Sequence, residues 1–177
     1  MAITLRIQND TGRTENANSY IDVEWFQEYA AESGYDVEGT FDDEEDQKVH
    51  LVRAFRYMNT RFNYKGEMTA YDQSSAFPRY NLTDRNGYLI SGVPLAAKQA
   101  QAEYAWLSKT LDGGLNPTPT RDATGARITQ VSERVGPISE SKSFASGGAF
   151  EMPEYPVPDG ILRAAGFIVT GGTIIRG

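Results

Sequence analysis

Apolar residues recur at helical spacing in two long segments of the chain. In the first segment they fall at i, i+4, i+7 and i+11, namely at Leu51, Phe55, Met58 and Phe62. In the second they follow steps of three and four, at Ala97, Ala100, Tyr104, Leu107 and Leu111. These spacings predict two amphipathic helices, one ending near residue 61 and one starting at Pro94. The alanines of the second helix allow another helix to approach it closely.

Shorter patterns precede these two helices. Residues 3–7 alternate apolar and polar side chains, which predicts a short strand. Asp22 is suited to cap a short helix that carries Trp25, Phe26 and Tyr29 and stops before Gly34. The acidic run 42–46 stands directly before the first long helix, where carboxylates complement the helix dipole.

Glycine, proline and polar residues separate the remaining elements. Residues 63–92 are predicted to be mostly loop, with a tight turn at Asn86-Gly87. Gly113-Gly114 ends the second long helix, and 115–127 form a linker. Residues 128–135 and 138–144 alternate on either side of Gly136-Pro137, which predicts a hairpin or two extended arms. A last short helix is expected from about Pro158 to Ala165.

This succession of elements predicts a mainly α fold: a small helical bundle with an extended C-terminal arm that contains a short β-hairpin. We expect a helical domain over residues 1–112 and an extended arm with a docking tail over 113–177. The tail carries apolar residues but no companion elements to cover them, so we expect it to lie against a partner.

Charge is distributed unevenly along the 177 residues, whose formal net charge is -7. Residues 1–46 hold thirteen acids against two bases, whereas residues 47–110 hold nine bases against four acids. Such polarity suggests separate surfaces for separate partners, and a simple solvated acidic face explains it equally well. An acidic chain is a poor nonspecific ligand for nucleic acid, although it can surround DNA without binding it.

The residue types needed for common catalytic and metal sites are scarce. The chain has no cysteine and one histidine, His50, and it contains neither a Gly-x-Ser-x-Gly motif nor a phosphate-binding glycine loop. We therefore expect no enzymatic activity, no cofactor and no metal. The first residues do not resemble a signal peptide, and no apolar run is long enough to predict a membrane span.

One segment invites a nucleic-acid interpretation. Between Arg53 and Lys65 aromatic and basic side chains interleave, as they do where bases of single strands stack. Core packing explains Phe55 and Phe62 at helical spacing better. A replication accessory that binds single-stranded DNA is therefore the alternative function.

Three groups of residues resemble a known family in their order. The first is Asn18-Ser19-Tyr20 within 17–21; the second runs from residue 48 through Phe77-Pro78-Arg79 to Asn86-Gly87; the third starts at Val93-Pro94. They resemble the head-tail connector (adaptor or neck) proteins of tailed bacteriophages, a family also labelled DnaT-like single-stranded-DNA-binding protein. Residues 132–138 are similar as well. The family usually has Trp where this chain has Phe77.

The resemblance implies a structural virion protein rather than an enzyme. It implies a homo-oligomeric ring, commonly of twelve copies, that binds the portal protein above and a downstream neck or tail-completion protein below. Genomic double-stranded DNA would pass through its channel without sequence-specific binding. The protein would be assembled in the host cytoplasm, would reside in the virion neck and would have no membrane partner.

Residue roles follow from the same resemblance. The tail would bind the portal or a neighbouring subunit through Phe167, Ile168, Val169, Ile174, Ile175 and Arg176. Deleting 166–177 would then abolish docking and leave the helical domain folded. Tyr20 is expected in the core, and Arg79 either pairs with an acid of its own chain or bridges subunits.

Overall fold

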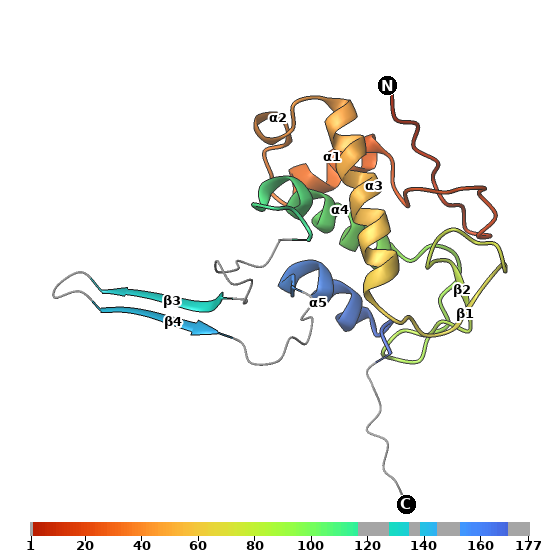
Figure 1. The fold of residues 1–177 in the computed structure, drawn as a ribbon. Helices are drawn as coiled ribbons and strands as arrows, with labels where there is room; N and C mark the ends of the chain where they lie inside the picture. The colour runs from red at the N-terminus through yellow and green to blue at the C-terminus, as the bar shows by residue number, and fades with distance from the viewer. Residues whose placement is uncertain (1, 117–127, 135–138, 145–152, 170–177) are drawn as a thin grey trace, which may run out of the picture. The chain divides into compact units, whose positions relative to one another are not determined.

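The computed structural model describes residues 2–116, 128–134, 139–144 and 153–169. These residues fall into two compact units: a body formed by 1–115 together with 154–177, and a second unit formed by 116–153. The chain is mainly helical with a small antiparallel hairpin, as the sequence predicts (Figure 1). The body contains five helices and a very short two-stranded sheet within the described residues.

Two long helices form the centre of the body. Helix α3 (Glu44–Arg61) packs against α4 (Leu95–Thr110), and α5 (Pro156–Ala165) packs on α4 (Figure 1). The alanines of α4 make this close approach possible, because Ala97, Ala100 and Ala105 are completely buried. Both long helices and α5 are confirmed, although α4 begins one residue after the expected Pro94.

Aspartate side chains fix where the first three helices begin. Asp22 caps α1 (Val23–Glu32), Asp36 caps α2 (Val37–Thr40) and Asp43 caps α3. Each accepts a hydrogen bond from a backbone N–H three residues further on, which satisfies a donor that the helix leaves free. The acidic run before α3 therefore has a structural role at the helix start.

A buried glutamine joins the two long helices to the segment before α1. The side chain of Gln101, completely buried on α4, accepts a hydrogen bond from the Tyr20 N–H at 2.8 Å. Its Nε2 donates to Ser19 Oγ at 2.7 Å and to the Leu51 carbonyl of α3 at 3.0 Å. Because each polar atom of this amide has a partner, the core gains a specific arrangement without an unsatisfied group.

A buried ion pair attaches α5 to the end of α3. Arg61 Nε donates to Asp159 Oδ1 at 3.0 Å, and both side chains are less than a tenth exposed. Asp159 also accepts hydrogen bonds from Tyr104 OH and from the Tyr155 N–H. The partners compensate the charges, so losing either one would leave an uncompensated buried charge.

The segment after α5 returns to the body instead of forming part of an arm. Gly166 adopts a left-handed conformation at the end of α5 (φ 81°), and Phe167 then packs against Phe77 with 3% of its surface exposed. The Phe167 carbonyl accepts from the Lys65 N–H, and the Val169 N–H donates to the Asn63 carbonyl, both at 2.8 Å. The expected boundary at residue 112 thus differs from the structure, which assigns 154–169 to the body. Pairing with residues 63–65 supplies the partner that the sequence pattern did not reveal.

The strands are fewer and shorter in the body than the pattern suggests. The expected strand over 3–7 forms only one bridge, between Ile7 and Ser19. The Asn18 side chain instead accepts a hydrogen bond from the N–H of residue 6 and donates one to the carbonyl of residue 4. Strand β1 (Glu67–Met68) pairs with β2 (Arg79–Tyr80). In the second unit, β3 (Ile128–Arg134) pairs antiparallel with β4 (Ser139–Phe144), which confirms the hairpin.

The Gln101 contacts generate a prediction about stability. The Gln101→Ala variant should lower the free energy of unfolding by about 2–4 kcal/mol, since the Tyr20 N–H would lose its buried acceptor and a cavity would form. Urea denaturation followed by circular dichroism measures the change. Gln99→Ala, on a partly exposed position of the same helix, is the control and should change stability by less than about 1 kcal/mol. Equal losses in the two variants would contradict the role of Gln101.

Candidate functional site

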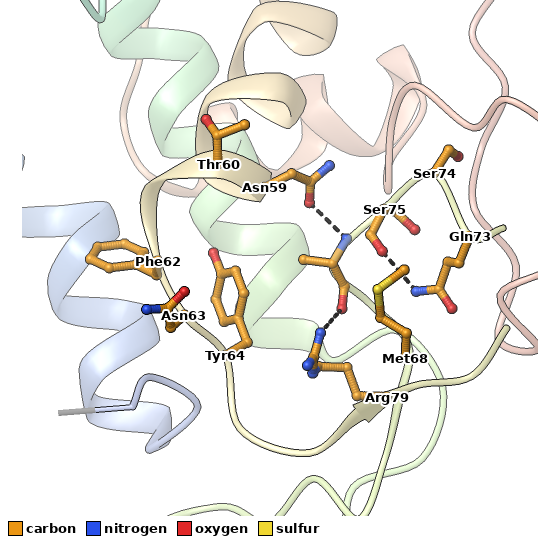
Figure 2. A pocket seen from close by; sticks show the side chains of 11 residues that line it. Asn59, Thr60, Phe62, Asn63, Tyr64, Met68, Gln73, Ser74, Ser75 and Arg79 are labelled. Carbon is orange, nitrogen blue, oxygen red and sulfur yellow. Dashed lines mark hydrogen bonds between the residues drawn. The ribbon is translucent and has the colours of Figure 1, made fainter. Parts of the chain in front are cut away.

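A polar pocket of about 440 Å³ lies where α3 ends (Figure 2). One wall is the last turn of α3 and the residues after it, and the other is the loop between β1 and β2. Its lining consists of Asn59, Thr60, Phe62, Asn63, Tyr64, Met68, Gln73, Ser74, Ser75, Ala76 and Arg79. Hydroxyl, amide and guanidinium groups thus line a pocket that is large enough to hold part of a ligand.

The wall formed by the loop is held in place by Asn59 and Tyr20. Asn59 Oδ1 accepts from the Ala76 N–H at 3.0 Å and from Tyr20 OH at 2.7 Å. Tyr20 OH accepts in turn from the Phe77 N–H at 3.1 Å. Burial raises the pKa of Tyr20, so its hydroxyl stays protonated. The position of the loop therefore depends on a residue that precedes α1.

Further hydrogen bonds are made within the loop itself. Gln73 Nε2 donates to the Ser75 carbonyl at 2.8 Å and to the Pro78 carbonyl at 3.0 Å. Ser75 Oγ donates to the Phe77 carbonyl at 2.6 Å and accepts from Gln8 Nε2 at 2.7 Å. These bonds give the loop one defined conformation, so the pocket is preformed.

Arg79 carries the positive charge of the pocket and uses it on backbone carbonyls. Its guanidinium donates to the carbonyls of Lys65 at 2.7 Å, Gly66 at 2.8 Å and Ala76 at 3.1 Å. Burial lowers its pKa. In the part of the chain that the structure describes, no carboxylate forms the expected ion pair with it.

Large exposed apolar side chains concentrate in one stretch of the sequence, from residue 68 to residue 95. Met68, Tyr80, Tyr88, Leu89 and Leu95 are between 42% and 72% exposed, and Tyr71 is fully exposed. They account for six of the nine such side chains among the described residues. We call Met68, Tyr71, Tyr80, Tyr88 and Leu89 the exposed loop residues. Sequence reasoning missed them because loop residues show no periodicity, although their position in a long ordered loop was a usable signal.

The segment suggested for base stacking does not present its aromatic rings to solvent. Phe55, Tyr57 and Tyr64 are buried in the core, and Arg61 is bound to Asp159. Core packing therefore explains these residues, and the exposed tyrosines lie in the following loops instead.

Most residues of the family-like motif organise the fold. Asn18 bonds to the backbone of Thr4 and Arg6, and Ser19 is held by Gln101. Tyr20 lies in the core, as expected. Phe77 and Pro78 are buried beside it, joined by a cis peptide bond, and Pro94 immediately precedes α4. Of these residues Arg79 lines the pocket, and Tyr20 and Phe77 support its wall from the core through the Phe77 N–H bond to Tyr20 OH.

The tail residues expected to bind a partner differ in accessibility. Phe167 is buried in the core, so its side chain is not accessible, and Ile168 is half-buried beside Tyr64. Val169 is 49% exposed. Ile174, Ile175 and Arg176 lie outside the described residues.

Between α3 and α4, Ser108 contacts His50, and His50 in turn contacts Asp46. His50 Nδ1 is 2.8 Å from Ser108 Oγ, and His50 Nε2 is 3.4 Å from Asp46 Oδ1. Ser108 is 7% exposed, and its position inside α4 commits the neighbouring N–H groups to helical hydrogen bonds. A nucleophile would need access and free N–H donors for an oxyanion, so we interpret the contact as a helix-to-helix polar contact.

Neither a metal cluster nor a membrane helix is found in what the structure describes. No group of three or more histidine, aspartate or glutamate side chains gathers there in a way that could hold a metal ion. No helix among the same residues is long and apolar enough to cross a membrane.

Comparison with known proteins assigns the family. Residues 3–175 match the model of a family described as "putative DnaT-like ssDNA binding protein". The match covers nearly the whole chain, and the protein therefore belongs to that family. No curated protein and no solved structure matches the chain.

The environment of His50 generates a prediction about pH. Burial lowers its pKa below the ordinary 6.5, although Asp46 opposes the shift. Below about pH 6.5 the unfolded chain binds a proton that the folded chain resists, so the free energy of unfolding should fall between pH 7.5 and 5.5. Urea midpoints measure this. Because His50 is the single histidine, the His50→Gln variant should show a smaller fall. The same fall in both proteins would show that His50 is not responsible.

Proposed function

We propose that this protein is a structural head-tail connector subunit of a tailed bacteriophage, forming a ring beneath the portal. The observation that carries the proposal is the hairpin β3–β4, a sheet of two strands alone within the described residues. An isolated two-stranded hairpin is only marginally stable in water, and its open edges accept further strands. Such an element favours function through a partner, and the resemblance of the motifs favours a connector as the particular kind of protein.

The contacts of the body are consistent with an assembly role. Three buried polar side chains form hydrogen bonds that join helices to one another: those of Gln101, His50 and Asp159. Large apolar side chains are instead exposed in the loops, where a protein partner would find them. The number of copies, the portal contact and the position in the virion neck belong to this proposal.

Electron microscopy of the protein with and without the portal protein of the same virus tests the proposal. We expect rings mounted on portals. A variant in which 128–144 are replaced by a short glycine-serine linker should lose docking and keep the thermal midpoint of the body, which has its own core. Portals that remain bare with the full-length protein would contradict the connector function.

A test of the tail requires a shorter truncation than the deletion of 166–177 that the sequence favours. Removing 166–177 would also remove Phe167 from the core, so loss of docking could reflect unfolding. Removing 170–177 keeps Phe167 and the Val169 N–H bond to Asn63. If docking survives this truncation while the body stays folded, the portal role of Ile174, Ile175 and Arg176 is wrong.

A second candidate function is binding of single-stranded DNA. The description of the family favours it over the connector. The structure offers a specific observation as well: Tyr71, Tyr80 and Tyr88 are exposed, and the bases Lys65 and Arg85 lie in the same loops. Exposed aromatic rings near bases can stack the bases of a single strand.

Charge limits this second candidate. Residues 63–92 contain three bases and three acids, so the loops are neutral overall. Binding through phosphates requires an excess of positive charge. We therefore keep the connector as the first proposal.

Titration of a labelled oligonucleotide separates the two candidates. If the protein binds single-stranded DNA, Tyr71→Ala, Tyr80→Ala and Tyr88→Ala should each weaken binding by about 5- to 150-fold, and added salt should weaken it further. Val157→Ala, at an exposed apolar position on α5, is the control and should bind like the unmodified protein. Absence of binding at micromolar protein would exclude this candidate.

A further inference from the structure

The pocket at the end of α3 contains a positive charge that no described carboxylate pairs with. Arg79 has five N–H donors, of which three are used on carbonyls. Its remaining donors, the Asn63 side chain and the exposed Met68 belong to one preformed space (Figure 2). A ligand that suits this space carries a carboxylate on a short apolar stem.

A surface of matching charge lies on α1 of the same chain. Glu24, Glu28 and Glu32 follow one another at i, i+4 and i+8, which places them on one face of the helix. All three are exposed, and none forms an ion pair among the described residues. We call them the α1 acidic stripe. It lies within residues 22–46, which hold eleven acids and no base.

One molecule does not bring the stripe and the pocket together. Gln27 of α1 donates to Gln47 of α3 at 3.0 Å, so the stripe from Glu28 onward lies beside the start of α3. The pocket begins at Asn59, twelve residues along the same helix, which corresponds to about 18 Å. Glu28 and Glu32 therefore lie toward the opposite end of α3 from the pocket.

We propose that the Arg79 pocket of one copy binds a glutamate of the α1 acidic stripe of a second copy. The proposal rests on the connector function, because it names the surfaces that would join the copies of the ring. Contact between two different faces is head-to-tail, and such contacts close into rings when the rotation between copies allows it.

The rim of the pocket suits a carboxylate partner. Asn63 lines the pocket and is exposed, and its side-chain amide can donate to a glutamate. Met68, which lines the pocket and is 42% exposed, adds apolar surface that a partner would cover.

Cross-linking tests the contact directly, since the chain has no cysteine of its own. Asn63→Cys and Glu28→Cys change exposed side chains that make no hydrogen bond among the described residues. On mild oxidation, free or mounted on portals, the double variant should give a ladder of covalent oligomers. A mixture of the two single variants should give dimers across this contact. Glu15→Cys combined with Asn63→Cys is the matched control and should give no ladder.

Charge substitutions provide an independent test by sedimentation. Met68 is opposite Arg79 in the sheet register, so Met68→Glu places a carboxylate beside Arg79 within one copy. It should weaken self-association at least about tenfold, whereas the uncharged Met68→Gln should not. Glu28→Lys with Glu32→Lys should weaken it equally, and the same charge change at Glu15 and Asp112 should not.

The outcomes distinguish this inference from the connector function. Portal-mounted rings that form no cross-link, or that tolerate Met68→Glu, would overturn the inference and leave the connector function intact. If Met68→Glu instead abolishes binding of single-stranded DNA and no copies associate, the pocket binds phosphate and the second-copy assignment is wrong. A protein that never joins portals would overturn the connector function itself.

Discussion

The architecture depends on the hydrogen bonds of one buried amide, that of Gln101. Through it α4 holds α3 at Leu51 and the segment before α1 at Ser19 and Tyr20. Tyr20 then holds Asn59 and the Phe77 N–H. Since a buried amide is stable only with its partners in place, these segments must adopt their positions together. The pocket at the end of α3 exists because this chain of hydrogen bonds continues from the core into the loop.

Packing contacts hold one part of the body in place and leave the side chains of another part exposed. Arg61 and Asp159 attach α5, and Phe167 returns the following segment to the core. In contrast, the exposed loop residues and the α1 acidic stripe contribute little to packing. We therefore propose that the loops, α1 and the hairpin unit carry the contacts with partners.

Much of the fold could be predicted from the sequence because the spacing of apolar residues identifies helices and strands. The Leu51–Phe62 spacing, the capping Asp22 and the alternation around Gly136-Pro137 were sufficient to locate three elements. Contacts between distant residues were not predictable, since Arg61 and Asp159 are 98 positions apart. Gln101 was missed because a search for apolar periodicity passes over a polar residue on the buried face. Phe167 was misassigned to a free tail because its partners, residues 63–65 and Phe77, follow no pattern that points to it.

Hydrogen exchange at the Tyr20 amide tests this account most directly, because its acceptor is the side chain of Gln101 on another element. The account predicts that this amide exchanges only when the whole body unfolds, at the same opening free energy as core amides of α4 such as that of Ala100. Rapid exchange at Tyr20 while the amides of α4 stay protected would contradict it.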